Sequence, residues 1–250
     1  MNAMTITSSW ETLAEGLRAW LAKPQGIASP PGILLYIEAF GVNAHMRGVA
    51  ERFAQAGYAA IIPDIFHGKT FEYDDIEHAL PVVRELDDQQ VMRESVETLA
   101  CLAAAGMSGK PAVAGYCMGG RLAFLAGIEL GARLSAAVCY YGGAIAPGKD
   151  KDKYGRTPPI GRVAELAVQT LLHYGGKDRS IDAEEHARVV AALSKAGKRY
   201  VVSVYPEAGH GFNCDERPSY DAHAAAEAWD LTLAFLARHS NTERVLPKNS

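Results

Sequence analysis

The sequence lacks long apolar runs and a strong charge of either sign. Its 250 residues carry 25 Lys and Arg against 29 Asp and Glu, for a net charge of −4, which offers no basic surface to nucleic acid or to an anionic membrane. No stretch approaches the roughly 20 apolar residues of a membrane-spanning helix. Residues 1–13 do not show the basic and then apolar pattern of a secretion signal. We therefore expect a cytoplasmic protein that binds neither nucleic acid nor membranes.

Cysteine is scarce, and its spacing matches no common thiol-rich site. The four cysteines are Cys101, Cys117, Cys139 and Cys214, and no pair has the CxxC or zinc-ribbon spacing of a metal site. Three of them lie in apolar or strand-like segments, which is typical of reduced thiols in a reducing compartment. The sequence therefore predicts no metal site built on these cysteines.

The chain has the length and apolar content of one globular domain. It is 48% hydrophobic, which is too apolar for a disordered chain, and an α/β domain can reach this length. Neither an internal repeat nor a linker rich in Pro, Gly or Ser divides it. We expect one domain over residues 1–250, with residues 1–13 and 240–250 peripheral or frayed.

Strands and helices alternate along the sequence. The predicted strands cover residues 16–23, 32–37, 58–64, 112–116, 134–140, 168–174 and 200–205. The predicted helices cover residues 44–56, 95–105, 121–130, 183–196 and 220–238. Most of the strands are continuous apolar runs, which is typical of strands covered on both faces, so this order predicts an α/β fold with a mostly parallel, doubly wound sheet. Residues 16–23 roughly alternate apolar and polar side chains, as an antiparallel edge strand does.

Two stretches interrupt this alternation. Residues 67–88 are acidic and broken, and residues 142–165 are rich in Gly, Pro and Lys. Each of them directly follows a predicted strand. Because ligands bind beyond the carboxyl ends of parallel strands, we expect both stretches to form walls of a binding site.

The strongest local motif is the sequence GYCMGG at residues 115–120. It follows a buried strand and opens a helix, as the nucleophile elbow of many hydrolases does, with Cys117 in the nucleophile position. Small residues at Gly115 and Gly119 let the strand and the helix approach each other closely. The Cys117 side chain then projects above the sheet at a helix N-terminus, where the helix dipole favours a thiolate.

A carboxylate and an imidazole follow the elbow in the chain order that such hydrolases use. Asp178 lies just after the strand at residues 168–174, and His210 lies just after the strand at residues 200–205. Asp178 can orient the imidazole, and His210 can reach the Cys117 thiol. Asp182 is the competing carboxylate, but its place before a helix fits an N-cap better.

Together these motifs resemble the dienelactone hydrolase family, whose members are cysteine-dependent α/β-hydrolases also called carboxymethylenebutenolidases. The resemblance rests on residues 37–43, 58–64, 176–178 and 209–212 together with the elbow at Cys117. It covers the chain from about residue 14 to about residue 238. It implies an α/β-hydrolase fold and the hydrolysis of a small ester or lactone.

By this resemblance, Cys117 is the nucleophile, His210 the base and later the acid, and Asp178 the orienting carboxylate. Thiolate attack on the substrate carbonyl gives a thioacyl-enzyme, which water activated by His210 hydrolyses. This scheme needs neither a metal nor an organic cofactor, and its partner is the small ester or lactone itself.

The resemblance also implies roles for residues around the thiol. Glu38 matches a family glutamate that sits against the resting thiol, and a carboxylate there disfavours the thiolate until substrate displaces it. The backbone amides of Met118 and Ala39 match the oxyanion hole. Phe40 and Phe212 flank the expected site and, with Tyr116, are candidates to contact the substrate.

One departure from the family pattern concerns the substrate. Family members that act on dienelactone hold its carboxylate with arginines, one of them four residues after the histidine, where this chain has Cys214. Arg84 is the only basic residue in residues 71–85, where the second arginine is expected. The possible substitutes are Arg217, Arg156 and Arg162.

Two other functions fit the same residues. One is a catalytically silent binding protein that uses the same pocket, although an intact triad argues against it. The other is a thiol redox protein that uses Cys117. The composition leaves a monomer and a homodimer equally open.

Overall fold

The fold is described from a computed structural model that describes residues 4–148 and 155–239. Within these residues a single sheet has eight strands in the order β1-β2-β4-β3-β5-β6-β7-β8. The strands are β1 (Ile6–Thr12), β2 (Arg18–Pro24), β3 (Pro31–Tyr36), β4 (Ala59–Pro63), β5 (Ser108–Tyr116), β6 (Ala136–Tyr140), β7 (Gln169–Gly175) and β8 (Tyr200–Tyr205). The six strands β3 to β8 are parallel to one another, and β2 is antiparallel to its neighbours β1 and β4. The predicted α/β fold with a mostly parallel sheet is therefore confirmed.

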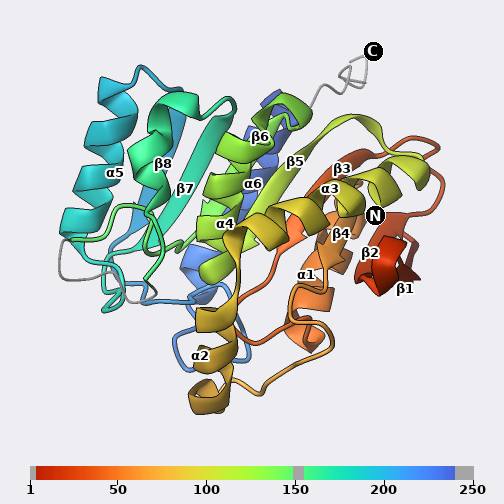
Figure 1. Ribbon diagram of the computed structural model, residues 1–250, viewed down its shortest axis with the longest axis horizontal. Coiled ribbons are helices and arrows are strands. Elements are labelled where there is room, and N and C mark those ends of the chain that lie inside the picture. The colour runs from red at the N-terminus through yellow and green to blue at the C-terminus, as the bar shows by residue number, and fades with distance from the viewer. Residues whose placement is uncertain (1–3, 149–154, 240–250) are drawn as a thin grey trace.

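Helices cover both faces of the sheet. The helices are α1 (Ala44–Gln55), α2 (Ile76–Glu85), α3 (Asp88–Ala104), α4 (Met118–Glu129), α5 (Ala183–Lys195) and α6 (Ala222–His239). In Figure 1, α3, α4 and α5 lie in front of the sheet, while α1 and α6 lie behind it. The rings of Phe53 in α1 and Trp229 in α6 are 4.7 Å apart, so these two helices pack on the same face. None of the helices in the described ranges is long and apolar enough to cross a membrane.

The N-terminal edge of the sheet differs from the prediction. Residues 6–12, expected to be peripheral or frayed, form β1, and β2 is therefore the second strand rather than the edge. Trp10 and Trp20 lie opposite each other in this register, with ring centroids 5.6 Å apart. This aromatic pair and the antiparallel ladder hold the short polar segment on the sheet. Residues 240–250, also expected to fray, lie outside the described residues.

The stretch at residues 67–88 is more ordered than its sequence indicated. It contains helix α2, with Pro81 inside it, and α3 begins at Asp88 rather than near residue 95. Proline removes a helical hydrogen bond, but Ala79 and Val83 are buried and hold α2 against the domain. Figure 1 shows α2 below the sheet, apart from the two helical layers.

The order of the strands creates the place for a site. From β3 the chain moves to β4 on one side of the sheet and later to β5 on the other side. Such a switch point leaves a crevice beyond the carboxyl ends of the two central strands. Glu38 and Ala39 follow β3 there, and Cys117 follows β5.

Candidate active site

Cys117 sits in a strained turn between β5 and α4. Its backbone has φ 56° and ψ −118°, a conformation that residues other than glycine rarely adopt. A Cβ at Gly115 would lie 2.0 Å from the Gly119 carbonyl oxygen, and a Cβ at Gly119 would lie 2.5 Å from the Ile37 carbonyl oxygen. The strand and the helix can meet only because both positions are glycine, as the sequence predicted.

The three residues of the predicted triad lie in one hydrogen-bonded line. His210 Nε2 is 3.0 Å from Cys117 Sγ, and His210 Nδ1 is 2.7 Å from Asp178 Oδ2. The Asp178 carboxylate is fully buried, and its other oxygen accepts hydrogen bonds from the backbone amides of Ser180 and Ile181. These amides fix the carboxylate, which in turn orients the imidazole.

The charges around His210 favour its protonated form. Burial alone would lower the pKa of the imidazole, but the Cys117 sulfur and the Asp178 carboxylate outweigh burial and raise the pKa to about 10. The protonated ring can therefore exchange a proton with the sulfur on one side, while the carboxylate on the other side balances its positive charge. Asp182, the rejected competitor, caps α5 by accepting from the Glu185 amide at 2.8 Å.

A cavity of about 340 Å³ opens above the thiol. Its walls come from α2, from the loops after β3, β6 and β7, and from the His210 loop. The lining residues are Ala39, Phe40, Ile76, Leu80, Arg84, Cys117, Met118, Gly143, Ala144, Ser180, Ile181, Asp182, Glu185, His210 and Arg217. Residues from both 67–88 and 142–165 thus contribute to the walls, as predicted, although residues 149–154 lie outside the described ranges.

The sequence predicts that two backbone amides donate to the substrate oxygen, and the residues that carry them lie at this cavity. Ala39 and Met118 both line it. The Met118 amide belongs to the first residue of α4, so it has no partner within the helix. The Ala39 amide donates no hydrogen bond to another described residue. Both are free to donate to an oxygen bound near the thiol.

Glu38 is fully buried next to this cavity. Its Oε1 atom accepts a hydrogen bond from the Tyr141 hydroxyl at 3.2 Å and lies 3.6 Å from Arg217 Nη1. Its Oε2 atom is buried and has no hydrogen-bond partner among the described residues. Here the Cys117 thiol faces His210, and Glu38 faces Tyr141 and Arg217.

Only some of the candidate arginines reach the cavity. Arg217 and Arg84 line it, and Arg217 lies 5.8 Å from the ring centre of Phe40. Burial alone would lower the pKa of Arg217, but the Glu38 carboxylate raises it, so the guanidinium stays charged. Arg156 and Arg162 instead line a separate cavity of about 430 Å³ that contains neither Cys117 nor His210.

The three predicted aromatic contacts lie at different depths. Phe40 lines the cavity. Phe212 and Tyr116 are fully buried and pack against Tyr140, with Tyr116 stacked on it at 4.4 Å. Their burial supports a packing role rather than direct contact with the substrate.

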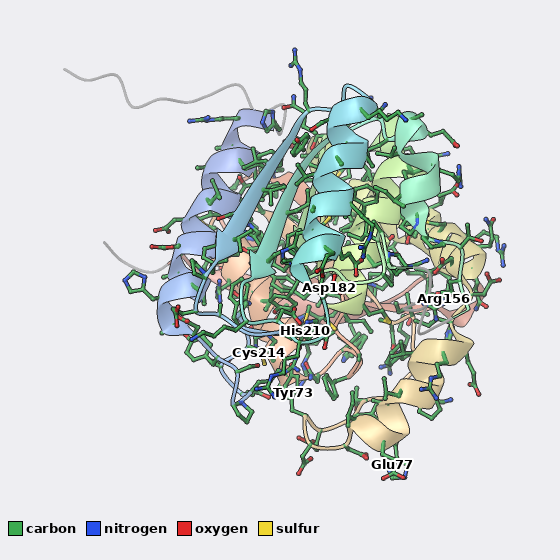
Figure 2. The ribbon with its side chains drawn as sticks, turned by 90° about the vertical axis from the view of Figure 1, so that its left-hand side faces the viewer. Tyr73, Glu77, Arg156, Asp182, His210 and Cys214 are labelled. Carbon is green, nitrogen blue, oxygen red and sulfur yellow. The ribbon has the colours of Figure 1, made fainter. Side chains whose placement is uncertain are left out.

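Sequence reasoning missed Tyr141 and the α2 side chains. The Tyr141 ring lies 5.4 Å from the His210 ring, and its hydroxyl binds Glu38. Its position directly after β6, at the carboxyl end of a central strand, was the available signal. Ile76 and Leu80 lie on α2 and line the cavity. The sequence did not predict this helix because Pro81 lies inside it. Figure 2 shows His210, Tyr73 and Cys214 gathered at the end of the molecule where α2 lies.

Comparisons with known proteins find similar sequences and a similar structure. The sequence profile of the dienelactone hydrolase family matches residues 17–240. A protein from Yersinia pestis named "putative carboxymethylenebutenolidase" is 33% identical over 239 residues, which cover 94% of this chain and 88% of that protein. A "probable 2-oxo-3-(5-oxofuran-2-ylidene)propanoate lactonase" from Bradyrhizobium is 30% identical over 246 residues, covering 96% and 97%. The crystal structure of a "putative dienelactone hydrolase" from Klebsiella pneumoniae superposes with a TM-score of 0.85 at 31% identity, covering 95% of this chain and all of that one.

Proposed function

Because this chain belongs to the dienelactone hydrolase family and is a hydrolase of the ester and lactone type, we propose that Cys117 is its nucleophile. In this proposal His210 transfers protons, and Asp178 orients the imidazole. The observation that carries it is the continuous hydrogen-bonded line from sulfur to imidazole to carboxylate, with distances of 3.0 and 2.7 Å. A sulfur, a base and an orienting acid in this order are the parts that covalent acyl transfer needs.

The first half of the reaction acylates the thiol. The Cys117 thiolate attacks the carbonyl carbon, and a C–S bond forms while the carbonyl oxygen takes the negative charge. The Ala39 and Met118 amides donate hydrogen bonds to that oxygen. When the intermediate collapses, the C–O bond of the ester or lactone breaks, and the leaving alkoxide takes the proton from His210 Nε2. The acyl group then remains on Cys117 as a thioester.

The second half releases the acid. His210, now neutral, takes a proton from a water molecule, and the resulting hydroxide attacks the thioester carbonyl. The same two amides stabilise the second oxyanion. Its collapse breaks the C–S bond, which returns the carboxylic acid and the pair of Cys117 thiolate and protonated His210. With a lactone as substrate, the product is one ring-opened hydroxy acid or its tautomer.

The cavity favours substrates that carry a carboxylate. Arg217 and Arg84 are the arginines among its lining residues, and they share it with the nucleophile. An arginine binds a carboxylate through charge-assisted hydrogen bonds. The relative from Bradyrhizobium has a name that describes a lactone attached to a propanoate. We therefore propose small lactones or esters with a free carboxylate as the substrate class of this chain.

The direct test compares ester turnover by wild type, Cys117→Ala and Cys101→Ala. Cys101 is another free and partly exposed cysteine, but it lies in α3, so Cys101→Ala controls for general effects of losing a thiol. We expect Cys117→Ala to lose at least ~10³-fold in kcat/KM and Cys101→Ala to keep the wild-type rate. Equal rates for wild type and Cys117→Ala would remove Cys117 from the chemistry.

The alternative functions predict different results in the same assay. A silent binding protein would bind the ester without turning it over in the wild type. A thiol redox protein would consume peroxide through Cys117 and leave the ester intact. Either outcome would contradict the proposed hydrolase.

A further inference from the structure

Three potential metal ligands gather behind the active site. Glu38, His45 and Cys214 are all buried, and each offers one donor atom that lies within 4.8 Å of the other two. Glu38 in the loop after β3 and His45 in the first turn of α1 are close in the sequence, whereas Cys214 comes from the distant loop after His210. Figure 2 labels Cys214 and His210 at the same end of the molecule.

Two of these side chains have buried atoms without a partner. Glu38 Oε2 and His45 Nε2 make no hydrogen bond to any residue in the described ranges. Both side chains are at least nine-tenths buried, with 0% and 5% of their area exposed. A buried polar atom without a partner costs free energy unless something binds it, and here the two residues that carry such atoms belong to one cluster.

The other nitrogen of His45 is already oriented. His45 Nδ1 lies 3.3 Å from the Asp215 carboxylate, which leaves Nε2 as the free atom of the ring. A histidine that binds a metal through one nitrogen usually donates its other N–H to a carboxylate or a carbonyl, which fixes the ring. Asp215 occupies that supporting position for His45.

We propose that Cys214 Sγ, His45 Nε2 and Glu38 form a site for a thiophilic divalent cation of the Zn²⁺ class. Sulfur, imidazole nitrogen and carboxylate oxygen are the donors that Zn²⁺ takes, with bonds of about 2.0–2.3 Å. Donors bound to one tetrahedral ion at these lengths lie about 3.3–3.8 Å apart, so the three side chains, whose donor atoms lie within 4.8 Å of one another, must move together by up to about 1 Å to bind an ion. Three protein ligands leave one coordination position open.

The local charges support a cation in this position. A bound Zn²⁺ would meet the Glu38 carboxylate and a Cys214 thiolate, with the Asp215 carboxylate behind His45. Arg217 contributes one opposing positive charge, 3.6 Å from Glu38. Two charges on the ion and one on Arg217 are thus balanced by the three negative groups.

This site is distinct from the proposed reaction chemistry but shares Glu38 with it. The proposed acyl transfer uses Cys117, His210 and Asp178, and none of these binds the ion in our proposal. An ion that takes Glu38 would compete with Arg217 for the same carboxylate. Metal binding is therefore expected to change the surroundings of the thiol, but the binding itself does not rest on the proposed function.

The test measures metal binding directly in the Cys117→Ser protein, which removes the active-site thiol as a competing ligand. Co²⁺ serves as a spectroscopic probe, because a thiolate ligand gives a sulfur-to-cobalt charge-transfer band. Competition with Zn²⁺ gives the stoichiometry and the affinity. We expect one ion per chain with a thiolate band.

Matched variants on that background identify the ligands. Cys214→Ser is expected to abolish the thiolate band and weaken binding by at least ~100-fold, while Cys101→Ser retains both. His45→Gln is expected to weaken binding to a similar extent with the Cys214 thiol present. Asp215→Asn is expected to weaken it by about tenfold. His45→Gln carries the same test if Cys214→Ser does not fold.

Two results would overturn the proposal. One is the absence of Zn²⁺ or Co²⁺ binding to the folded Cys117→Ser protein. The other is a band that persists in Cys214→Ser or disappears in Cys101→Ser, which would place the ion elsewhere. Because the protein under test lacks the proposed nucleophile, failure of this site and failure of the proposed function give different observations.

Discussion

Arg217 Nη1 lies 3.6 Å from Glu38 Oε1, and Arg217 also lines the cavity that contains Cys117. The guanidinium therefore lies where a substrate carboxylate can compete with Glu38 for it. Arg217 stands seven residues after His210 instead of four, and it still reaches the cavity. This relationship connects substrate recognition to the carboxylate that we expect to restrain the thiol.

Replacing Arg217 should reduce activity selectively for charged substrates. We expect Arg217→Gln to lower kcat/KM about 10–100-fold for lactones with a free carboxylate, because a hydrogen bond to a charged group contributes about 1.5–3 kcal/mol. Neutral esters of the same size should change far less. Arg162→Gln is the matched control, since Arg162 pairs with Glu129 and Glu165 away from this cavity. An equal loss on both substrate types would contradict carboxylate recognition by Arg217.

Glu38 should control the reactivity of the thiol. We expect Glu38→Gln to change the rate at which iodoacetamide alkylates Cys117, because the amide removes a buried negative charge from the surroundings of the thiol. Tyr141→Phe is the comparison variant: it removes the hydroxyl that binds Glu38 but keeps the carboxylate. Identical alkylation rates for wild type and Glu38→Gln across the pH range would show that Glu38 does not restrain the Cys117 thiol.

The raised pKa of His210 predicts how stability depends on pH. Folding raises this pKa from an ordinary value of about 6.5 to about 10, so the folded state favours the protonated imidazole. Its stabilising contribution is complete below about pH 6.5 and is lost as the pH rises through about 10. The difference in free energy of unfolding between wild type and His210→Gln should therefore shrink from pH 6 to pH 10. Urea unfolding at both pH values measures it, and a difference that grows would be inconsistent with this charge state.

The elbow should tolerate no side chain at its glycines. A Cβ at Gly119 would meet the Ile37 carbonyl oxygen at 2.5 Å, so we expect Gly119→Ala to lower the free energy of unfolding by at least about 2 kcal/mol. Gly48 is an exposed glycine in α1 with open space around it. There the same substitution should stabilise the protein by roughly 0.5–1 kcal/mol. Thermal or urea unfolding of both variants tests the pair, and a stable Gly119→Ala protein would refute the tight contact.

Much of the fold could be predicted because its signals are local. The apolar runs of β3 to β7 and the Asp182 cap are properties of short windows, and the structure has this cap. The geometry of Cys117, Asp178 and His210 could be anticipated because each follows a strand of a parallel sheet. Topology then brings the ends of those strands to one edge.

The remaining features depend on contacts that no short window encodes. β1 is held by pairing with β2 and by Trp10 against Trp20, and its own residues are largely polar. α2 contains Pro81, which predicts the end of a helix, and only the packing of Val83 in the folded domain explains why the helix continues. The approach of Arg217 to Glu38 requires the fold of the loop after His210.

The central claim is that the acyl group passes through the sulfur of Cys117, and rapid quenching tests it most directly. Wild-type protein is mixed with a small aryl ester, quenched in acid during the first turnovers, and analysed by mass spectrometry of the intact chain and its peptides. The account predicts one acyl group per chain, on the peptide that contains Cys117, released by hydroxylamine and formed at least as fast as turnover. Turnover without such an adduct, or with the acyl group on another residue at a competent rate, would contradict it.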